Sequence, residues 1–253
     1  MKSSKSKKKY KALLIDVDGT LIKNTGDSLP SLEVIKAIEK GSSKIKIGVA
    51  SSRPYFMLKH ILNTIKISGP FITLGGAQIF SENNKLIWEM PFKRNDVEVL
   101  ASIGKKLKAH MQFQNENIGI ENYSLKGIDK ICGLWMHGLS FDIAEQFLRA
   151  AQVVKDVSIF RVVSWKEKSI DLSVCPSQAT KQHAVYELAK LLNIDHSEIM
   201  VIGDSYNDFP LLMGGGFRVA MENGVDEVKA IADYIAPSVD NDGVADVIKK
   251  FIL

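Results

Sequence analysis

The chain is poor in cysteine and has no long hydrophobic run. Its 253 residues include two cysteines, Cys132 and Cys175, which stand far apart and form no CxxC pair. This spacing argues against a disulfide scaffold and a cysteine zinc site; two free thiols fit a reducing cytoplasm, although a single disulfide stays open. No stretch reaches the length of a membrane span, and no apolar signal region follows the first lysines. We therefore expect a cytoplasmic protein that contacts no membrane.

The chain also lacks an excess of acidic residues, because its net charge at pH 7 is +4. Six of the lysines lie within residues 2–11, and removing them from +4 leaves −2. The rest of the chain is therefore mildly acidic. We expect residues 1–9 to be a solvated, disordered tail, and we expect no nucleic-acid partner. The five histidines are scattered without metal-ligand spacing, so they predict no histidine site.

What is present is an alternation of strand-like and helix-like segments. The predicted strands cover residues 10–16, 45–50 and 71–74, and the predicted helices cover 31–40 and 54–65. Strands that alternate with helices in this order indicate a parallel, doubly wound α/β sheet.

The pattern changes after residue 79 and returns near residue 175. The intervening α+β block is predicted to hold strands at 85–90, 119–123, 130–137, 157–164 and 169–174, with helices at 97–108 and 141–154. The later α/β segments are helix 177–192, strand 198–202, helix 207–213, strand 217–220 and helices 226–232 and 244–251. We therefore predict a Rossmann-like core from residues 1–80 and 175–253, with an inserted cap domain of residues 81–174.

Polar residues gather where the predicted core strands end. An apolar strand leads directly into two acids, Asp16 and Asp18, and a glycine turn. Burying an unpaired carboxylate is costly, and a divalent cation is the commonest way to make such a pair tolerable. The further clusters are Ser51-Ser52-Arg53, Lys181, and the run that contains Asp204, Asn207 and Asp208. Because the carboxyl ends of parallel strands share one edge of a sheet, we expect these side chains to converge.

The acids suit the transfer of a phosphoryl group. A carboxylate such as Asp16 is able to attack phosphorus and form an aspartyl-phosphate. Asp18 is then placed to protonate the leaving alkoxide and to take a proton from the hydrolytic water. Mg²⁺ would remove the repulsion between carboxylate and phosphate. Asp16 and Asp204 are suited to be its direct ligands, and Asp208 to hold a bound water.

The other polar residues suit recognition of the phosphate. Lys181 offers a positive charge and Ser51 a hydroxyl donor to the phosphoryl oxygens. Arg53 is expected either to bind substrate or to pair with an acid.

Four motifs in this order resemble those of the haloacid dehalogenase superfamily of phosphatases, in its Cof-like branch. The motifs are DVDGT at 16–20, SSRP at 51–54, TK at 180–181 and GDSYND at 203–208. Two later segments, VAMENG at 219–224 and DGVA at 242–245, resemble further segments of that branch. The resemblance covers both halves of the core, and the insertion lies where this branch carries a large α/β cap of type IIB.

The resemblance implies a Mg²⁺-dependent phosphatase for a small phosphorylated metabolite, commonly a sugar phosphate. By analogy, Asp16 is the nucleophile and a metal ligand. Asp18 is the acid/base, and its backbone carbonyl binds the metal. Asp204 is a further metal ligand. The remaining assignments are phosphate or substrate binding for Ser51, Ser52, Arg53, Lys181 and Asn207, and support of the metal by Asn207 and Asp208.

Four positions depart from the pattern of this branch. Ser52, Gln182 and Glu222 stand where it has glycine, and Gly75 stands where it has asparagine. None of these changes removes a reacting group. These departures therefore bear on which substrate is bound more than on whether the reaction occurs.

Two other functions stay open. A phosphomutase similar to phosphomannomutase shares the core, the cap and DVDGT, but its fourth motif has a longer loop. A phospho-aspartate receiver module gathers the same groups around Mg²⁺, but it has about half this length. For any of these we expect a monomer or a weak homodimer.

Overall fold

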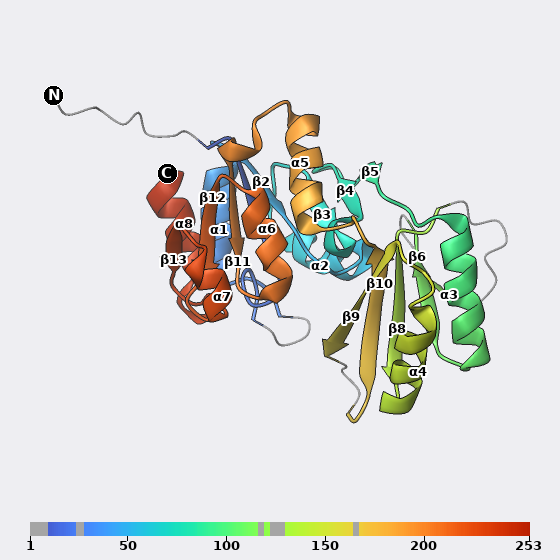
Figure 1. Cartoon of the computed structure of the whole chain (residues 1–253). Coiled ribbons are helices and arrows are strands. Elements are labelled where there is room, and N and C mark those ends of the chain that lie inside the picture. Colours follow the sequence, from blue (N-terminus) through green and yellow to red (C-terminus); the bar gives the residue numbers. More distant parts are fainter. Residues whose placement is uncertain (1–9, 24–27, 116–118, 122–129, 164–166) are drawn as a thin grey trace.

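A five-stranded parallel sheet forms the centre of the core (Figure 1). The computed structural model describes residues 10–23, 28–115, 119–121, 130–163 and 167–253. The strands are β1 (Ala12–Ile15), β2 (Lys46–Val49), β11 (Ile199–Gly203), β12 (Phe217–Met221) and β13 (Tyr234–Ala236), in the order β13-β12-β11-β1-β2. The sheet thus combines both ends of the chain, and the predicted fold class is confirmed.

Alternate side chains of this sheet enter two different hydrophobic clusters. Leu13 and Ile15 of β1 belong to one cluster, and Ala12 and Leu14 belong to the other. The first cluster is covered by α1 (Leu32–Ser42), α2 (Tyr55–Thr64) and α8 (Gly243–Phe251), and the second by α5 (Lys181–Leu192), α6 (Phe209–Gly214) and α7 (Asp226–Ala230). A strand buried on both faces has a continuous apolar sequence, as β1 does.

The predicted third strand does not join the parallel sheet. β3 (Phe71–Thr73) pairs with β4 (Gln78–Phe80), which pairs with β5 (Leu86–Glu89), in a separate antiparallel sheet. One bridge between Ala50 and Ile72 connects it to the core strands. The prediction was wrong because the turn η1 (Leu74–Gly76) reverses the chain at once and gives β3 a local partner.

Helix α5 begins later than the predicted start at residue 177. Thr180 is its N-cap, and the Thr180 side chain accepts a hydrogen bond of 3.2 Å from the backbone N–H of His183. Such a cap satisfies a donor that the first helical turn leaves unpaired. Lys181 is therefore the first residue of the helix.

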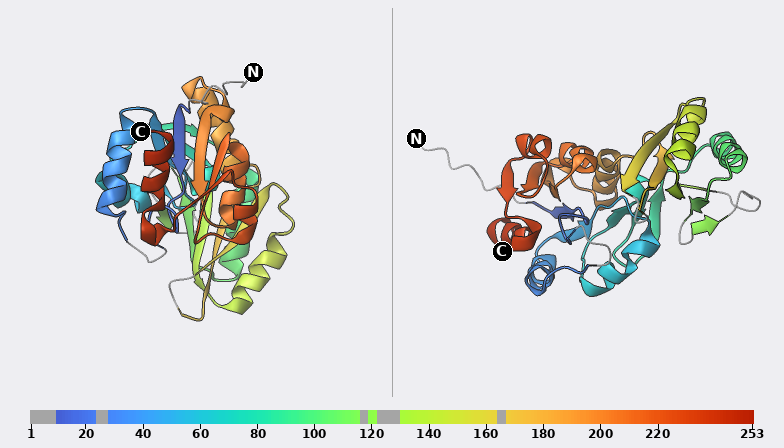
Figure 2. Two further views of the ribbon diagram at one scale, coloured as in Figure 1. Left: turned by 90° about the vertical axis from the view of Figure 1, so that its left-hand side faces the viewer. Right: turned by 90° about the horizontal axis from the view of Figure 1, so that it is seen from below.

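The inserted region forms a second, antiparallel sheet in the order β7-β6-β8-β10-β9. Its strands are β6 (Met111–Gln114), β7 (Gly119–Glu121), β8 (Gly133–Leu139), β9 (Val157–Val163) and β10 (Ile170–Pro176). Helices α3 (Arg94–Lys106) and α4 (Phe141–Ala151) pack on one face of this sheet, on the side away from the core (Figure 1 and Figure 2, right). We call this part the cap region; its predicted limits, residues 81 and 174, stay a prediction.

Some expectations lie outside the described residues. These are the tail of residues 1–9, the end of the predicted strand 119–123 and the last residue of the predicted strand 157–164. Across the described part of the chain, no helix has both the length and the apolar character needed to cross a bilayer.

Candidate active site

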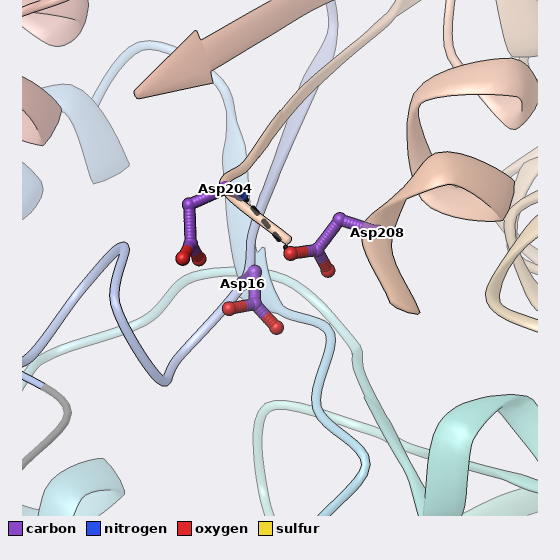
Figure 3. A group of neighbouring side chains, drawn as sticks. All are labelled: Asp16, Asp204 and Asp208. Carbon is purple, nitrogen blue, oxygen red and sulfur yellow. Dashed lines mark hydrogen bonds between the residues drawn. The ribbon is translucent and has the colours of Figure 1, made fainter. Parts of the chain in front are cut away.

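Three aspartates from two loops meet beside the ends of β1 and β11 (Figure 3). Asp16 directly follows β1, and its backbone N–H donates to the carbonyl of Ile202 in β11 at 2.9 Å. Asp204 directly follows β11, and Asp208 closes the short helix η3 (Tyr206–Asp208). One carboxylate oxygen from each lies within 4.8 Å of the others, and all three residues are buried. Parallel pairing of β1 and β11 therefore produces the convergence that the motifs predicted.

A buried lysine lies between two of these acids. The ammonium nitrogen of Lys181 is 2.6 Å from Asp16 Oδ1 and 2.6 Å from Asp208 Oδ1. Burial alone would lower the pKa of this lysine, but the two carboxylates outweigh burial and raise the pKa above its usual value. The Lys181 ammonium is therefore charged, and it fixes one oxygen of Asp16.

The cluster carries more negative than positive charge when all of its groups are ionised. Three carboxylates face one ammonium, which leaves an excess of two negative charges in a buried space. Burial, followed by repulsion from Asp208, raises the pKa of Asp16 well above its usual value. Burial also raises the pKa of Asp204 to about 6, against a hydrogen bond from Thr20 that lowers it. Oxygen ligands with this charge fit a hard divalent cation, which would balance the excess.

Hydrogen bonds fix the two later acids of the cluster. Asp208 Oδ2 accepts from the backbone N–H groups of Asp204 at 3.0 Å and Ser205 at 3.1 Å. The hydroxyl of Thr20 donates to Asp204 Oδ1 at 2.8 Å. With Oδ1 bound to Lys181 as well, both oxygens of Asp208 are engaged, which suits it to orient the site. Thr20 had no role in the sequence-based assignment, although it is the last residue of DVDGT.

The turn after Asp18 approaches Asp204 closely. Gly19 has a φ of +86°, and a Cβ at this position would lie 2.4 Å from Asp204 Oδ2. The carbonyl of Gly19 accepts a hydrogen bond of 2.9 Å from the side-chain amide of Asn223. Asn223 was also missed as a site residue, because its segment VAMENG carried a resemblance but no assigned chemistry.

Asp18 lies apart from the three buried acids and pairs with Arg53. The guanidinium donates from Nε to Asp18 Oδ2 at 2.9 Å and from Nη2 to Asp18 Oδ1 at 2.5 Å. The side chain of Asp18 is 37% exposed and that of Arg53 is 11% exposed. Of the two expectations for Arg53, pairing with an acid is the one that the structure shows. This two-point geometry holds the Asp18 carboxylate in one orientation.

The remaining predicted residues surround this pair and the acids. The Ser51 hydroxyl oxygen is buried and accepts from the backbone N–H of Arg53 at 3.0 Å, which leaves its hydrogen able to donate. The side-chain amide of Asn207 donates to Ser52 Oγ at 3.3 Å, joining the loop after β2 to the loop after β11. All nine predicted site residues thus gather at one edge of the sheet, and their individual roles stay predictions.

The four departures from the motif pattern leave this arrangement intact. Gly75 has a φ of 65° and a ψ of 12°, a left-handed conformation that asparagine also tolerates. The turn is therefore kept and only a side chain is lost. The Gln182 amide donates to the Tyr186 hydroxyl at 3.0 Å, and Glu222 accepts from the backbone N–H of Ser238 at 3.3 Å. Ser52 bonds to Asn207 as described above.

Comparison with known proteins points to one family. The family model of haloacid dehalogenase-like hydrolases matches residues 13–131 and 136–248. The 5-amino-6-(5-phospho-D-ribitylamino)uracil phosphatase YbjI of Escherichia coli is 28% identical, over 96% of this chain and 96% of its own. Phosphoglycolate phosphatase 1 of Saccharolobus solfataricus is 24% identical, again over 96% of both chains. A solved subclass IIB sugar phosphatase shares the fold with a TM-score of 0.75 and 22% identity, over 95% of this chain and 98% of the other.

Proposed function

Because the chain belongs to the haloacid dehalogenase-like hydrolase family, we propose that it is a Mg²⁺-dependent phosphatase of a small phosphorylated metabolite, such as a sugar phosphate. The observation that carries the proposal is the buried contact of Lys181 with Asp16, next to Asp204 and Asp208. The two relatives described above are named for different substrates, and both substrates are small phosphomonoesters.

The first step forms a phosphoryl-enzyme on Asp16. Lys181 holds Oδ1 of this carboxylate, so Oδ2 is the oxygen that attacks phosphorus. As the Oδ2–P bond forms, the bond between phosphorus and the ester oxygen breaks. Asp18 gives its proton to the leaving alkoxide, and the alcohol departs.

The second step reverses the role of Asp18. The carboxylate of Asp18 takes a proton from water, and the water oxygen attacks phosphorus. The bond from phosphorus to Asp16 breaks, which releases phosphate and restores the carboxylate. The two hydrogen bonds from Arg53 hold the Asp18 carboxylate in one orientation beside the buried acids.

Charge compensation comes from the chain and from a cation. The Lys181 ammonium and the Ser51 hydroxyl are placed to stabilise charge on the phosphoryl oxygens. Asp16, Asp204 and the backbone carbonyl of Asp18 would bind Mg²⁺, with Asp208 orienting the site. When bound, Mg²⁺ neutralises the repulsion between the carboxylate and the phosphate.

The breadth of the family match favours a phosphatase over a receiver module. The match includes both core segments and most of the inserted region, whereas a receiver has about half this length. In a phosphatase, a cap closing over the substrate would exclude water and choose the leaving group.

Release of inorganic phosphate tests the proposal. Wild-type protein with Mg²⁺ would be assayed on sugar phosphates, nucleotides, phosphoglycolate, pyridoxal phosphate and para-nitrophenyl phosphate, with EDTA as the metal-free arm. We expect multiple turnovers with Mg²⁺ and a loss of at least 1,000-fold in Asp16→Asn, of the order seen when a catalytic nucleophile is removed. Asp142→Asn, at an exposed position of the cap region, is the matched control. Near-wild-type turnover by Asp16→Asn contradicts the nucleophile assignment, and isomerised substrate without free phosphate indicates a mutase.

A further inference from the structure

Within the described residues of the cap region, both helices pack on one face of the cap sheet and leave its other face uncovered. Met111, Leu134, Met136 and Leu172 join the hydrophobic cluster beneath α3 and α4. Side chains alternate along a strand, so their neighbours in β6, β8 and β10 point to the other face. Figure 1 and the right view of Figure 2 show α3 and α4 on the side of the sheet away from the core. We call the opposite side the open face.

Four side chains of the open face form one row across four strands. Gln112 of β6 is opposite Trp135 of β8, Trp135 is opposite Ser173 of β10, and Ser173 is opposite Phe160 of β9. We call these four residues the aromatic row. Phe160 is 56% exposed, and Trp135 is partly exposed. None of the four side chains carries a charge.

The ring of Trp135 is held in place by a neighbouring strand. Its indole N–H donates to Asp171 Oδ2 at 3.4 Å, and Asp171 Oδ1 accepts from the backbone N–H of Gly138 at 2.8 Å. Asp171 is a buried residue of β10, so the indole of Trp135 reaches from β8 to the neighbouring strand. The polar edge of the indole is thereby engaged, and the ring offers a flat surface for stacking.

One end of the open face lies against the turn at Leu74–Gly76, beside the candidate active site. Gly133 lies two residues before Trp135 on the same strand, and a Cβ at Gly133 would touch Leu74 Cδ2 at 3.4 Å. Leu74 donates its backbone N–H to the carbonyl of Arg53 at 3.0 Å, and Gly75 donates to that of Ser51 at 3.0 Å. Two residues along a strand span about 7 Å. Trp135 of the aromatic row therefore lies about 7 Å along β8 from the contact with Leu74. The turn that contains Leu74 is hydrogen-bonded to residues 51–53, the predicted phosphate-binding segment.

We propose that the aromatic row recognises a flat, uncharged, unsaturated ring in the leaving group of the substrate. Trp135 and Phe160 stack on the ring, and Gln112 and Ser173 bond to its polar edge. The inference rests on the proposed function and deepens it: the substrate is a sugar or sugar-alcohol phosphate that carries such a ring, with the chain of the sugar spanning the turn at Leu74.

Two phosphate esters that differ only in the ring test this inference. Riboflavin 5′-phosphate and ribitol 5-phosphate share the phosphorylated ribityl chain. We expect the wild-type kcat/KM to be at least tenfold higher for the ring-bearing ester. Trp135→Ala and Phe160→Ala should each lower that value at least fivefold and leave the ring-free ester within twofold. Trp135→Phe should keep most of the preference, because it keeps a ring.

A control and a binding measurement separate recognition from folding. Phe141 is also a strongly exposed phenylalanine of the cap region, but it begins α4 on the helix-covered face, so Phe141→Ala should change neither ester. Riboflavin fluorescence should be quenched by the wild-type protein and not by Trp135→Ala. Melting curves of the variants identify any that fail to fold.

Each remaining outcome overturns either this inference or the proposal beneath it. Equal kcat/KM for the two esters, or equal losses on both in Trp135→Ala, contradicts ring recognition and leaves the phosphatase intact. Hydrolysis of other phosphomonoesters without hydrolysis of the ring-bearing ester also contradicts ring recognition and leaves the phosphatase proposal intact. Absence of hydrolysis on every phosphomonoester contradicts the proposed function, and this inference with it.

Discussion

Lys181 and Asp16 are 165 positions apart, yet the ammonium nitrogen of the lysine lies 2.6 Å from a carboxylate oxygen of the aspartate. Lys181 is the first residue of α5, which is the first element after the cap region, and Asp16 directly follows the first strand. The orientation of the proposed nucleophile therefore depends on a helix that follows the inserted region in the sequence.

Removal of this ammonium is expected to damage both stability and activity. Lys181→Met leaves Asp16 and Asp208 buried without their partner, which typically costs about 3–5 kcal/mol of unfolding free energy. We expect phosphatase activity to fall by at least about 100-fold. Chemical denaturation and phosphate release measure the two effects. Lys190→Met, at an exposed position of the same helix, is the control, and equal behaviour of the two variants would contradict the role of Lys181.

Replacement of Asp18 is expected to slow turnover in a way that depends on the leaving group. Asp18→Asn cannot transfer a proton, and positioned acid–base groups typically contribute about 100- to 10,000-fold. An alkyl phosphate has a poor leaving group and should show the full loss in the first step. Para-nitrophenyl phosphate needs no proton on its leaving group, so its burst of nitrophenol should survive while later turnover is slow. Equal loss of burst and turnover would count against this assignment.

Burial of Asp204 predicts a pH-dependent response to Mg²⁺. The pKa of Asp204 is raised from 3.8 to about 6. In the metal-free folded state, Asp204 is therefore mostly protonated below about pH 6 and mostly ionised above it. A raised carboxyl pKa contributes stability below pH about 4, and this contribution is lost as the pH rises to about 6. Asp16 acts in the same direction. Because Mg²⁺ binds the ionised form, its stabilising effect should be small near pH 5 and grow towards pH 7.

Thermal melting with and without Mg²⁺ across this pH range measures the effect. Asp204→Asn should abolish most of the Mg²⁺-induced shift. A shift that is the same at about pH 5 and about pH 7 would show that the ion binds somewhere other than these carboxylates.

The hydroxyl of Thr20 is expected to tune metal affinity. Thr20→Val removes the donor to Asp204 Oδ1 and keeps the shape of the side chain. Loss of such a supporting bond typically weakens metal binding by about 10- to 100-fold, which a Mg²⁺ titration of activity would show. Thr64→Val, which removes a hydrogen bond to the carbonyl of His60 in α2, should leave the Mg²⁺ requirement unchanged. An unchanged Mg²⁺ requirement in Thr20→Val would remove Thr20 from the site.

The motifs predicted that these residues converge, because they follow strands whose partners are set by topology. Asp16 and Asp204 directly follow neighbouring parallel strands, so the position of one predicts the position of the other. Lys181 was predicted from the motif, but its contact with Asp16 depends on the cap at Thr180, which places it at the first position of α5.

The failures arose where short-range patterns compete with contacts distant in sequence. Residues 71–73 are as apolar as a core strand, yet the turn at Leu74–Gly76 gives them a local antiparallel partner. The strands β4 and β13 were not predicted from the sequence. Each has three residues, too few for an alternating pattern to stand out. The pair of Asp18 with Arg53 was one of two expectations, because sequence does not give side-chain direction.

Transfer of the phosphoryl group through the carboxylate of Asp16 is tested most directly by capture of the phosphoryl-enzyme. Wild-type protein and Asp18→Asn would be mixed with Mg²⁺ and substrate, quenched in acid, reduced with borohydride and mapped by mass spectrometry. We predict reduction of an acyl phosphate at position 16, with more of it in Asp18→Asn because hydrolysis of the intermediate is slowed. Turnover with no modified residue, or modification at any other position, would contradict the account.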